Sequence, residues 1–266
     1  MNMHIWQRNS RHARHQGGFT LIELSIAMLI GLFLIGGLLV VLQGNRRVFN
    51  SQTQLALLQD NQRVAMTMIT DVVQSAGYYP DPVNNTSITM LPAAAPLVAG
   101  QSVYGTPNAT AALGDTLTIR YAAQSGDSIL NCNGSTYSGG GTHLYTNEFS
   151  IDVTPAANIQ PNWPFPYPNS WSLMCAVDGG TPVELITGLT RMEVWYAVKR
   201  SATTINSADT YLTVAQMQPA DWPNVMAIKV RLTFQNPLFI VGQTTPAATI
   251  PFERVIGVMN QNGVKL

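Results

Sequence analysis

Residues 17–43 read GGFTLIELSIAMLIGLFLIGGLLVVLQ, and this stretch organises the rest of the chain. Glu23 is the only charged residue between Phe19 and Leu42. At about 1.5 Å per residue, the run forms a helix of about 36 Å, which is long enough to span a bilayer. A carboxylate near the start of such a helix is costly unless another group pairs with it, so Glu23 is a candidate functional residue.

Basic residues lie mainly on the N-terminal side of the apolar run. Three arginines and three of the four histidines precede Phe19, whereas Arg46 and Arg47 follow the run. The positive-inside rule predicts a cytoplasmic N-terminus and a C-terminal part outside the cytoplasm. An ordinary cleaved signal peptide has a shorter apolar core and then a small-residue cleavage site, which this sequence lacks. A plain uncleaved anchor explains the run and the arginines but not the residues GGFTLIE.

The 266 residues suffice for one membrane segment and one modest globular domain. Acids and bases number 14 each, and removal of the segment before Phe19 leaves 11 bases against 14 acids. This balance disfavours a general nucleic-acid binder, which needs a clustered basic face.

The sequence contains no catalytic constellation. It has no G-x-S-x-G, P-loop or H-E-x-x-H motif, and His143 is the only histidine after Phe19. We therefore expect no enzyme activity, no cofactor and no metal site. Two alternatives stay open: a periplasmic hydrolase that uses His143 with a nearby serine, and a calcium site built from loop oxygens.

Two cysteines, Cys132 and Cys175, follow the apolar run. In an oxidising compartment they form one disulfide that closes a loop of about 44 residues, worth roughly 3–4 kcal/mol in the chain-entropy model. The alternative is a pair of buried free thiols. Because the part after the run is expected outside the cytoplasm, we predict the disulfide.

The helix is expected to continue well beyond the membrane segment. No proline occurs between Phe19 and Tyr79, and Gly77 and Pro80 follow in the usual order of helix-terminating residues. One helix of about 58 residues is predicted. Its second half carries an apolar stripe for a domain core, formed by Leu55, Leu58, Ala65, Met66, Ile69, Val72, Val73 and Ala76. The other faces are expected to hold Asn61, Gln62, Arg63, Thr70, Asp71 and Gln74.

Beyond Pro80 the sequence predicts an irregular connection over residues 80–112, followed by strands. Alternating residues predict strands in DTLTIRY (115–121), THLYTNEFSIDV (142–153), SWSLMCAV (170–177), RMEVWYAV (191–198) and VMAIKVRLTF (225–234). Such alternation favours an antiparallel sheet with one wet face, and the helix stripe covers the other. The predicted fold class is α+β, with a long N-terminal helix packed on an antiparallel β-sheet head. The proline- and aromatic-rich loop 158–171 either docks a partner or folds back on this head.

The residues GGFTLIE strongly resemble the class III signal of type IV prepilins. In that signal a short basic leader ends in Gly, and Phe and an acid at the fifth mature position follow. Gly18, Phe19 and Glu23 match it residue by residue. The resemblance implies cleavage after Gly18 by a prepilin peptidase and N-methylation of Phe19. Glu23 would then pair with the new Phe19 ammonium group, on its own chain or on a neighbour, and set the axial register of assembly.

The segment 45–80 resembles the minor pilins of the PilW type, a match carried by Asn61, Arg63, Ala65, Ala76, Gly77 and Tyr78. Later pieces such as GDTLTIRY and VELITGLTRMEVWYAV fit the same family, although FERVIGVMNQNG departs from it at Met259 to Gln261. The resemblance implies four segments. These are a cleaved leader (1–18), a transmembrane and filament-core helix (19–44), an amphipathic helix (45–79) and a β-rich head (80–266).

The same resemblance implies a minor pilin that takes part in initiating type IV pilus assembly and so supports twitching motility. Its partners would be other minor pilins, the major pilin, the prepilin peptidase and the inner-membrane assembly platform, with no nucleic acid. The chain would cross the bacterial inner membrane once, with its head in the periplasm and later in the pilus on the cell surface. The alternatives are a J-type minor pseudopilin of type II secretion and a tip adhesin or DNA receptor.

Overall fold

The structure is a computed structural model that describes Gly18 and residues 20–153, 171–201, 207–240, 242 and 244–259. Helix α1 comprises Leu21–Gln74 and helix α2 comprises Ser87–Met90. The strands are β1 (Val103–Tyr104), β2 (Leu117–Gln124), β3 (Thr142–Val153), β4 (Trp171–Val177), β5 (Val183–Val198), β6 (Thr210–Thr213), β7 (Val225–Gln235) and β8 (Thr249–Gly257). Three short 3-10 helices complete the described elements: η1 (Ala111–Leu113), η3 (Val214–Gln216) and η4 (Trp222–Asn224).

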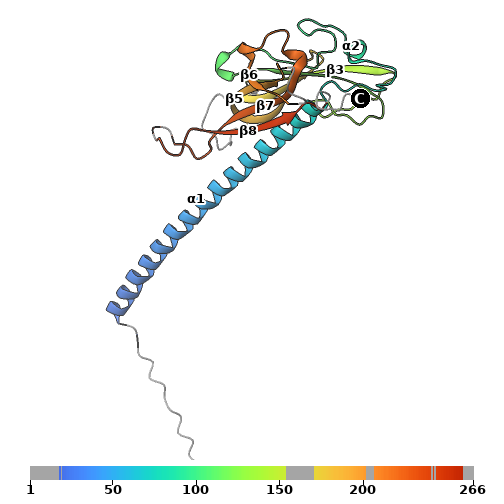
Figure 1. The fold of residues 1–266 in the computed structure, drawn as a ribbon. Helices are drawn as coiled ribbons and strands as arrows, with labels where there is room; N and C mark the ends of the chain where they lie inside the picture. The colour runs from blue at the N-terminus through green and yellow to red at the C-terminus, as the bar shows by residue number, and fades with distance from the viewer. Residues whose placement is uncertain are drawn as a thin grey trace, which may run out of the picture. The chain divides into compact units, whose positions relative to one another are not determined.

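The strands form one antiparallel sheet, which Figure 1 shows as the body of the head. Its order is β1-β2-β3-β4-β5-β7-β8, and β6 pairs with β5. Strands next to each other in the chain mostly pair, as short antiparallel connections favour. The predicted α+β class, a long N-terminal helix with an antiparallel β-sheet head, is confirmed.

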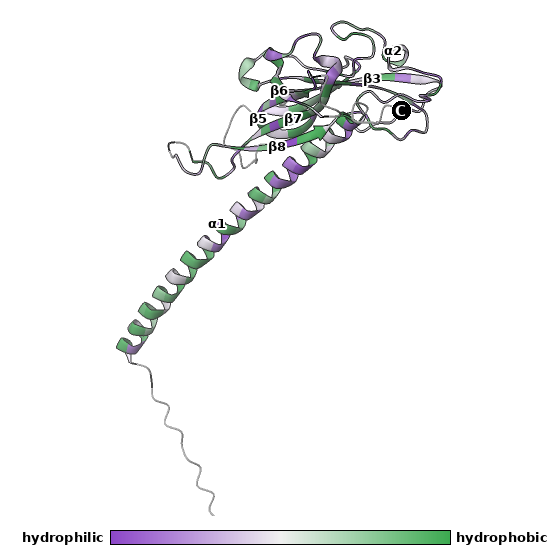
Figure 2. Cartoon of the chain, in the orientation of Figure 1, coloured by the Kyte–Doolittle hydropathy of each residue, from purple (hydrophilic) through white to green (hydrophobic). Residues whose placement is uncertain are grey.

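The chain divides into two units, residues 1–50 and 51–266. Within the first unit, α1 is long and apolar enough to cross a membrane. From Leu21 to Leu42 its side chains are exposed, except at the intermediate Gly31. Figure 2 shows this part of α1 as a nearly continuous hydrophobic surface. Such a surface suits lipid or other apolar helices rather than water.

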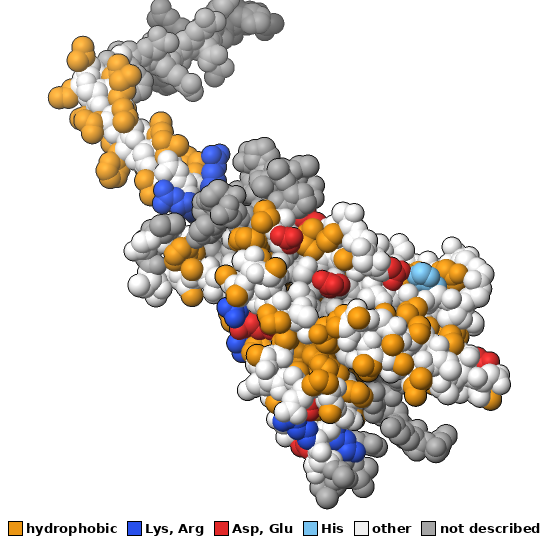
Figure 3. All heavy atoms as spheres, turned by 90° about the horizontal axis from the view of Figure 1, so that it is seen from above, with side chains coloured by type: hydrophobic (Ala, Val, Ile, Leu, Met, Phe, Trp, Pro, Cys, Tyr) orange, Lys and Arg blue, Asp and Glu red, His pale blue; other side chains and the backbone are white. Residues whose placement is uncertain are grey.

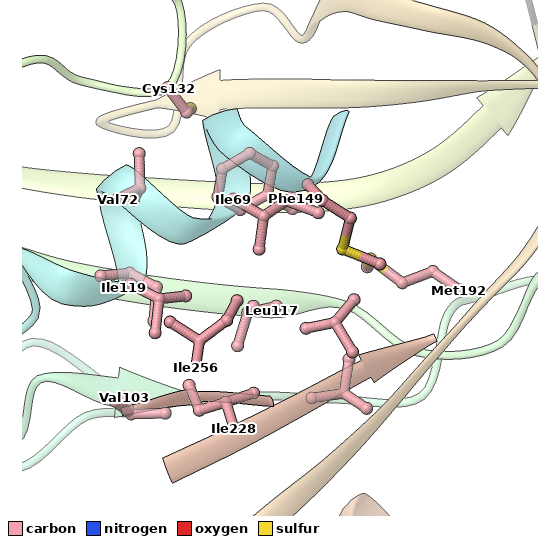
Figure 4. Close-up of a cluster of buried hydrophobic side chains, with 14 of the residues drawn as sticks. Ile69, Val72, Val103, Leu117, Ile119, Cys132, Phe149, Met192, Ile228 and Ile256 are labelled. Carbon is pink, nitrogen blue, oxygen red and sulfur yellow. The ribbon is translucent and has the colours of Figure 1, made fainter. Parts of the chain in front are cut away.

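In the second unit, the C-terminal part of α1 packs on one face of the sheet. Its buried side chains are Leu58, Gln62, Ala65, Met66, Ile69, Val72 and Val73. Figure 4 shows Ile69 and Val72 among the apolar side chains of Ile119, Phe149 and Ile256. Burial of this stripe holds the helix end and the sheet in one core.

The stripe differs from the prediction at Gln62, which we assigned to a polar face. Gln62 is only 9% exposed. It lies four residues after Leu58 and three before Ala65, so helical geometry places it on the same face as these buried residues.

The predicted strands are present, and alternation holds in β5 and β7. Inward-facing Met192, Val194, Tyr196, Ile228, Val230 and Leu232 are fully buried, whereas Glu193, Trp195, Lys229 and Arg231 are partly exposed. The expected wet face is wrong for β2, however, because seven of its eight residues are buried, Arg120 among them. The loop that precedes β1 supplies carbonyl groups to Arg120 and covers this side of the sheet.

The connection 80–112 is less irregular than predicted, because it contains α2 and the edge strand β1. The alternation analysis did not predict β6 and β8. Strand β6 has only four residues. Strand β8 contains Pro251, which is usual only on edge strands, and its neighbours Glu253 and Arg254 weaken the apolar pattern.

Candidate functional site

The first turn of α1 is closed by Thr20 and Glu23. The Thr20 backbone N–H and side-chain Oγ1 each donate to Glu23 Oε2 at 2.9 Å, and the Glu23 N–H donates to Thr20 Oγ1 at 3.3 Å. This reciprocal pattern is a capping box, which satisfies backbone donors that have no partner within the helix. The Glu23 carboxylate therefore already has a structural role within a single chain.

The residues of the processing signal lie just before this cap. Gly18 is exposed, and a Cβ atom added to it would meet no heavy atom within 4 Å. Phe19 lies outside the described residues, so the pairing of its ammonium group with Glu23 stays a prediction.

Glycines in the apolar half of α1 leave a shallow hollow on the helix surface. It has a volume of about 550 Å³ and is lined by Leu29, Leu32, Phe33, Gly36, Gly37 and Val40. Small residues of this kind let a second helix approach closely. We therefore interpret these glycines as helix-packing residues, rather than as residues that the membrane helix merely tolerates.

A larger groove lies where α1 ends, and we call it the helix-end groove. Its volume is about 750 Å³, and its walls are formed by Asp71, Gln74, Ser75, Ala76, Gly77, Tyr78, Tyr79, Asp81, Pro82, Ser128, Ile129, Leu130 and Met259. Three of the residues that carry the PilW-type resemblance, Ala76, Gly77 and Tyr78, are among these.

Backbone hydrogen bonds fix the floor of the helix-end groove. Gly77 adopts φ +75°, a conformation that favours glycine, and ends the helix. Its N–H donates to Arg120 O at 2.9 Å, and the Ala122 N–H donates to Tyr78 O at 2.8 Å. The segment after α1 is thereby joined to β2. Burial and the neighbouring Asp127 carboxylate raise the pKa of the Tyr78 hydroxyl.

Cys132 and Cys175 form a disulfide with a Cα–Cα distance of 6.0 Å, in agreement with the sequence prediction. Both residues are buried. The Cys132 N–H also donates to Asn147 Oδ1 at 2.9 Å. The bridge therefore ties the loop before β3 to strand β4. The same loop contributes Ile129 and Leu130 to the helix-end groove.

His143 is held in a pair with Asp178, with 2.8 Å between Nε2 and Oδ2. Its ring stacks on Tyr137 and meets the edge of Tyr145. These contacts make an aromatic and polar surface cluster. In the part of the chain that the structure describes, no three His, Cys, Asp or Glu side chains converge as metal ligands.

The outer face of β5 and β7 carries a ladder of paired charges around Trp195. Lys229 Nζ lies 4.3 Å and the Arg231 guanidinium 4.9 Å from the centre of its ring. Arg231 also pairs with Glu253 at 3.0 Å and with Glu193 at 3.6 Å. On the face seen in Figure 3, the basic side chains form no continuous patch. This ladder is locally neutralised, unlike a nucleic-acid footprint.

The proline- and aromatic-rich loop singled out in the sequence lies, up to residue 170, outside the described residues. Only Trp171, the first residue of β4, is described. The sequence did not predict the helix-end groove, because its walls come from three separate stretches of the chain: residues 71–82, residues 128–130 and Met259. The AGYYP stretch (76–80), which turns the chain back after the helix, was the available signal.

Two family models match the sequence. The model of the type IV pilus-assembly protein W, PilW, matches residues 169–262, and the prokaryotic N-terminal methylation motif matches residues 13–39. The curated proteins include no significant match.

Two solved structures are similar in part. A type IV-like pilin from Thermus thermophilus has 11% identity and a TM-score of 0.37, and the match covers 77% of this chain and 97% of that one. A chain in the GspK–GspI–GspJ complex of the type 2 secretion system from enterotoxigenic Escherichia coli has 10% identity and a TM-score of 0.34, with the same coverage. The methylation motif at the start of the chain and the PilW model over its last strands support a prepilin-like protein of the PilW type.

Proposed function

We propose that the protein is a minor pilin that helps to initiate type IV pilus assembly within a complex of minor pilins. One observation carries the proposal: a prepilin signal at the edge of an exposed apolar helix is joined to a head that the PilW model matches. The prepilin signal and this helix anchor the chain in a membrane. The proposed location before assembly is the inner membrane, with the N-terminus in the cytoplasm and the head in the periplasm.

The proposed partners follow from the parts of the chain. The apolar half of α1 suits the helices of other minor pilins and of the major pilin, because its apolar side chains are exposed among the described residues. Gly18 is the proposed substrate position of a prepilin peptidase, and the assembly platform of the inner membrane would receive the processed chain.

The test is deletion of the gene, with complementation by the intact chain. The proposal expects loss of twitching and of surface filaments, with normal secretion of an exoprotein. A strain that keeps its pili and loses exoprotein secretion would instead identify a minor pseudopilin. Normal twitching and normal secretion together would contradict both assembly functions.

A receptor for DNA is disfavoured by the described surface. Glu193 and Glu253 pair with two of the three described cations on the outer face of β5 and β7, Arg191 and Arg231, so the net charge left for phosphate groups is small. DNA uptake in the same deletion strain should therefore fall only as far as the loss of filaments explains, with no further loss from a missing DNA receptor. Purified full-length protein should not bind duplex DNA at physiological salt.

A further inference from the structure

The helix-end groove combines aromatic, aliphatic and acidic side chains. Tyr78 and Tyr79 supply aromatic rings, and Leu130 and Met259 supply aliphatic groups. Leu130 is 45% exposed and Met259 is 60% exposed. Apolar side chains left in water around a hollow are typical of a surface that a partner covers.

The groove is acidic, and stabilisation of the fold does not explain why carboxylates occupy these positions. Asp71 lies in the last turn of α1, where the helix dipole disfavours a carboxylate, and this turn contains no basic residue. Asp81, in the turn after the helix, adopts φ +55° and its carboxylate accepts one hydrogen bond, from Asn84 Nδ2 at 2.8 Å. Asp127 lies near Tyr78, a groove residue, and accepts a hydrogen bond from the Gln124 N–H at 2.9 Å.

None of these carboxylates forms an ion pair within the described residues, although Arg254 donates to Thr70 Oγ1, beside Asp71, at 3.4 Å. The residues that line the groove include no Lys, Arg or His. The ion pairs among the described residues engage Asp60, Asp178, Asp221, Glu193 and Glu253, but not the acids at the groove. The groove therefore presents a negative potential beside aromatic rings, which together attract a cation with an apolar stem.

We propose that the helix-end groove receives a cationic segment of a neighbouring pilin subunit, in which a Lys or Arg side chain lies next to an aliphatic or aromatic residue. The identity of the neighbour as a pilin rests on the proposed function. The cation binds the carboxylates of Asp71 and Asp81, and the apolar residue covers Leu130 and Met259. Charge complementarity of this kind selects the partner and the register of docking. Residues 45–49 of this chain, NRRVF, illustrate such a segment within α1, directly after its apolar run.

The test uses the full-length protein in cells that assemble pili. A photo-crosslinking amino acid replaces Tyr79 in the groove, alone and together with Asp71→Asn and Asp81→Asn. The control combines the same crosslinker with Asp60→Asn. Asp60 lies on the same helix, pairs with Arg63, and is not a groove residue. Crosslinked peptides are identified by mass spectrometry.

The expected product joins position 79 to another pilin subunit, at a segment that holds a Lys or Arg beside an apolar residue. The double substitution should lower its yield about tenfold, because charge-assisted contacts are lost, and Asp60→Asn should not change it. A product with residues 260–266 of the same chain would overturn the inference, because the groove would then be filled from within. A target segment without a basic residue, a yield insensitive to the double substitution, or no product at all would also overturn it.

The two proposals fail in different ways. Normal twitching after gene deletion would contradict the proposed function itself. Loss of twitching on deletion, combined with any of the overturning crosslinking results, would leave the pilin function in place and remove only the groove as its docking surface.

Discussion

At the scale of single residues, Glu23 has two candidate roles, as a helix cap and as the partner of a charged group. Its carboxylate closes a capping box with Thr20. The prepilin signal also implies an ion pair with the Phe19 ammonium group after cleavage. A cap needs only a hydrogen-bond acceptor, whereas the ion pair needs the negative charge. Substitutions that remove one property and keep the other can therefore decide between the roles.

We expect Glu23→Gln and Glu23→Ala to be almost equally defective in filament incorporation, and Thr20→Val to assemble nearly normally. Loss of the charge leaves an ammonium group unpaired in an apolar bundle, which costs about 3–5 kcal/mol, whereas loss of a cap costs about 1 kcal/mol. Sheared filaments and twitching zones give the result, and membrane-fraction blots control for insertion. Normal assembly of Glu23→Gln with failure of Thr20→Val would show that Glu23 acts only as a cap.

Asp221 makes the head sensitive to acid. Arg200 donates two hydrogen bonds to its carboxylate at 2.8 and 2.7 Å, and this pairing lowers the pKa of Asp221, which is 5% exposed. The pKa of Asp221 is lower in the folded state than in the unfolded state, where it is about 3.9. The ion pair therefore stabilises the folded protein at a pH above about 3.9, and this stabilisation is lost as the pH falls through the folded-state pKa.

We therefore expect Asp221→Asn to lower the thermal midpoint at pH 7 and to flatten its further fall between about pH 4 and pH 2. Thermal unfolding of the full-length protein in detergent across this range is the measurement. The exposed pair of Asp60 and Arg63 supplies the control, since Asp60→Asn should change little. An unchanged slope in Asp221→Asn would show that other carboxylates cause the acid sensitivity.

At the scale of elements, Arg120 connects β2 to the loop that precedes β1. Its guanidinium donates to the carbonyl oxygens of Pro92 at 2.8 Å, Val98 at 3.1 Å and Gln101 at 2.6 and 3.1 Å. Burial lowers the pKa of Arg120, which has no exposed surface. The planar fork of an arginine suits several carbonyl groups at once, so the residue orders the loop and covers the sheet.

Arg120→Ala should lower the free energy of unfolding by about 3 kcal/mol, because it leaves several carbonyl groups unpaired. Arg120→Lys should recover only part of this loss, since an ammonium group cannot reach all of the acceptors. Denaturant unfolding of the full-length protein measures both. Arg63→Ala, at an exposed position on α1, is the matched control. A loss equal to that of the control would contradict the role given to Arg120.

The disulfide links a loop to strand β4 across a sequence separation of 43. Thiol labelling without reductant should leave Cys132 and Cys175 unmodified, and Cys132→Ser should destabilise the head by roughly 2–4 kcal/mol. Reductant should bring the unmodified protein close to the variant. Full labelling of the native protein would show two free thiols and contradict the bridge.

At the scale of the whole molecule, we expect processing to convert a precursor into an assembly subunit. The mature chain should begin at Phe19 with an N-methyl group, and intact-mass measurement should show loss of residues 1–18. Gly18→Ala should accumulate the full-length precursor. The position is exposed and open, so the added methyl group disturbs no packing and the effect falls on cleavage. Gly17→Ala should be processed normally. Cleavage of Gly18→Ala at the normal rate would contradict the signal.

The sequence by itself determined the apolar membrane segment, the prepilin signal and most strands, and the orientation of this segment in the membrane stays a prediction. Each of these depends on residue spacing along the chain: an apolar run of sufficient length, a helical stripe, or the alternation of strands such as β7. It did not determine the burial of Arg120, because a loop about twenty residues earlier covers that position. Nor did it reveal the helix-end groove, whose walls come from the end of α1, the turn after it, residues 128–130 and Met259. Periodicity reports the local backbone and the average burial of a face, whereas contacts between distant segments exist only once the sheet has brought them together.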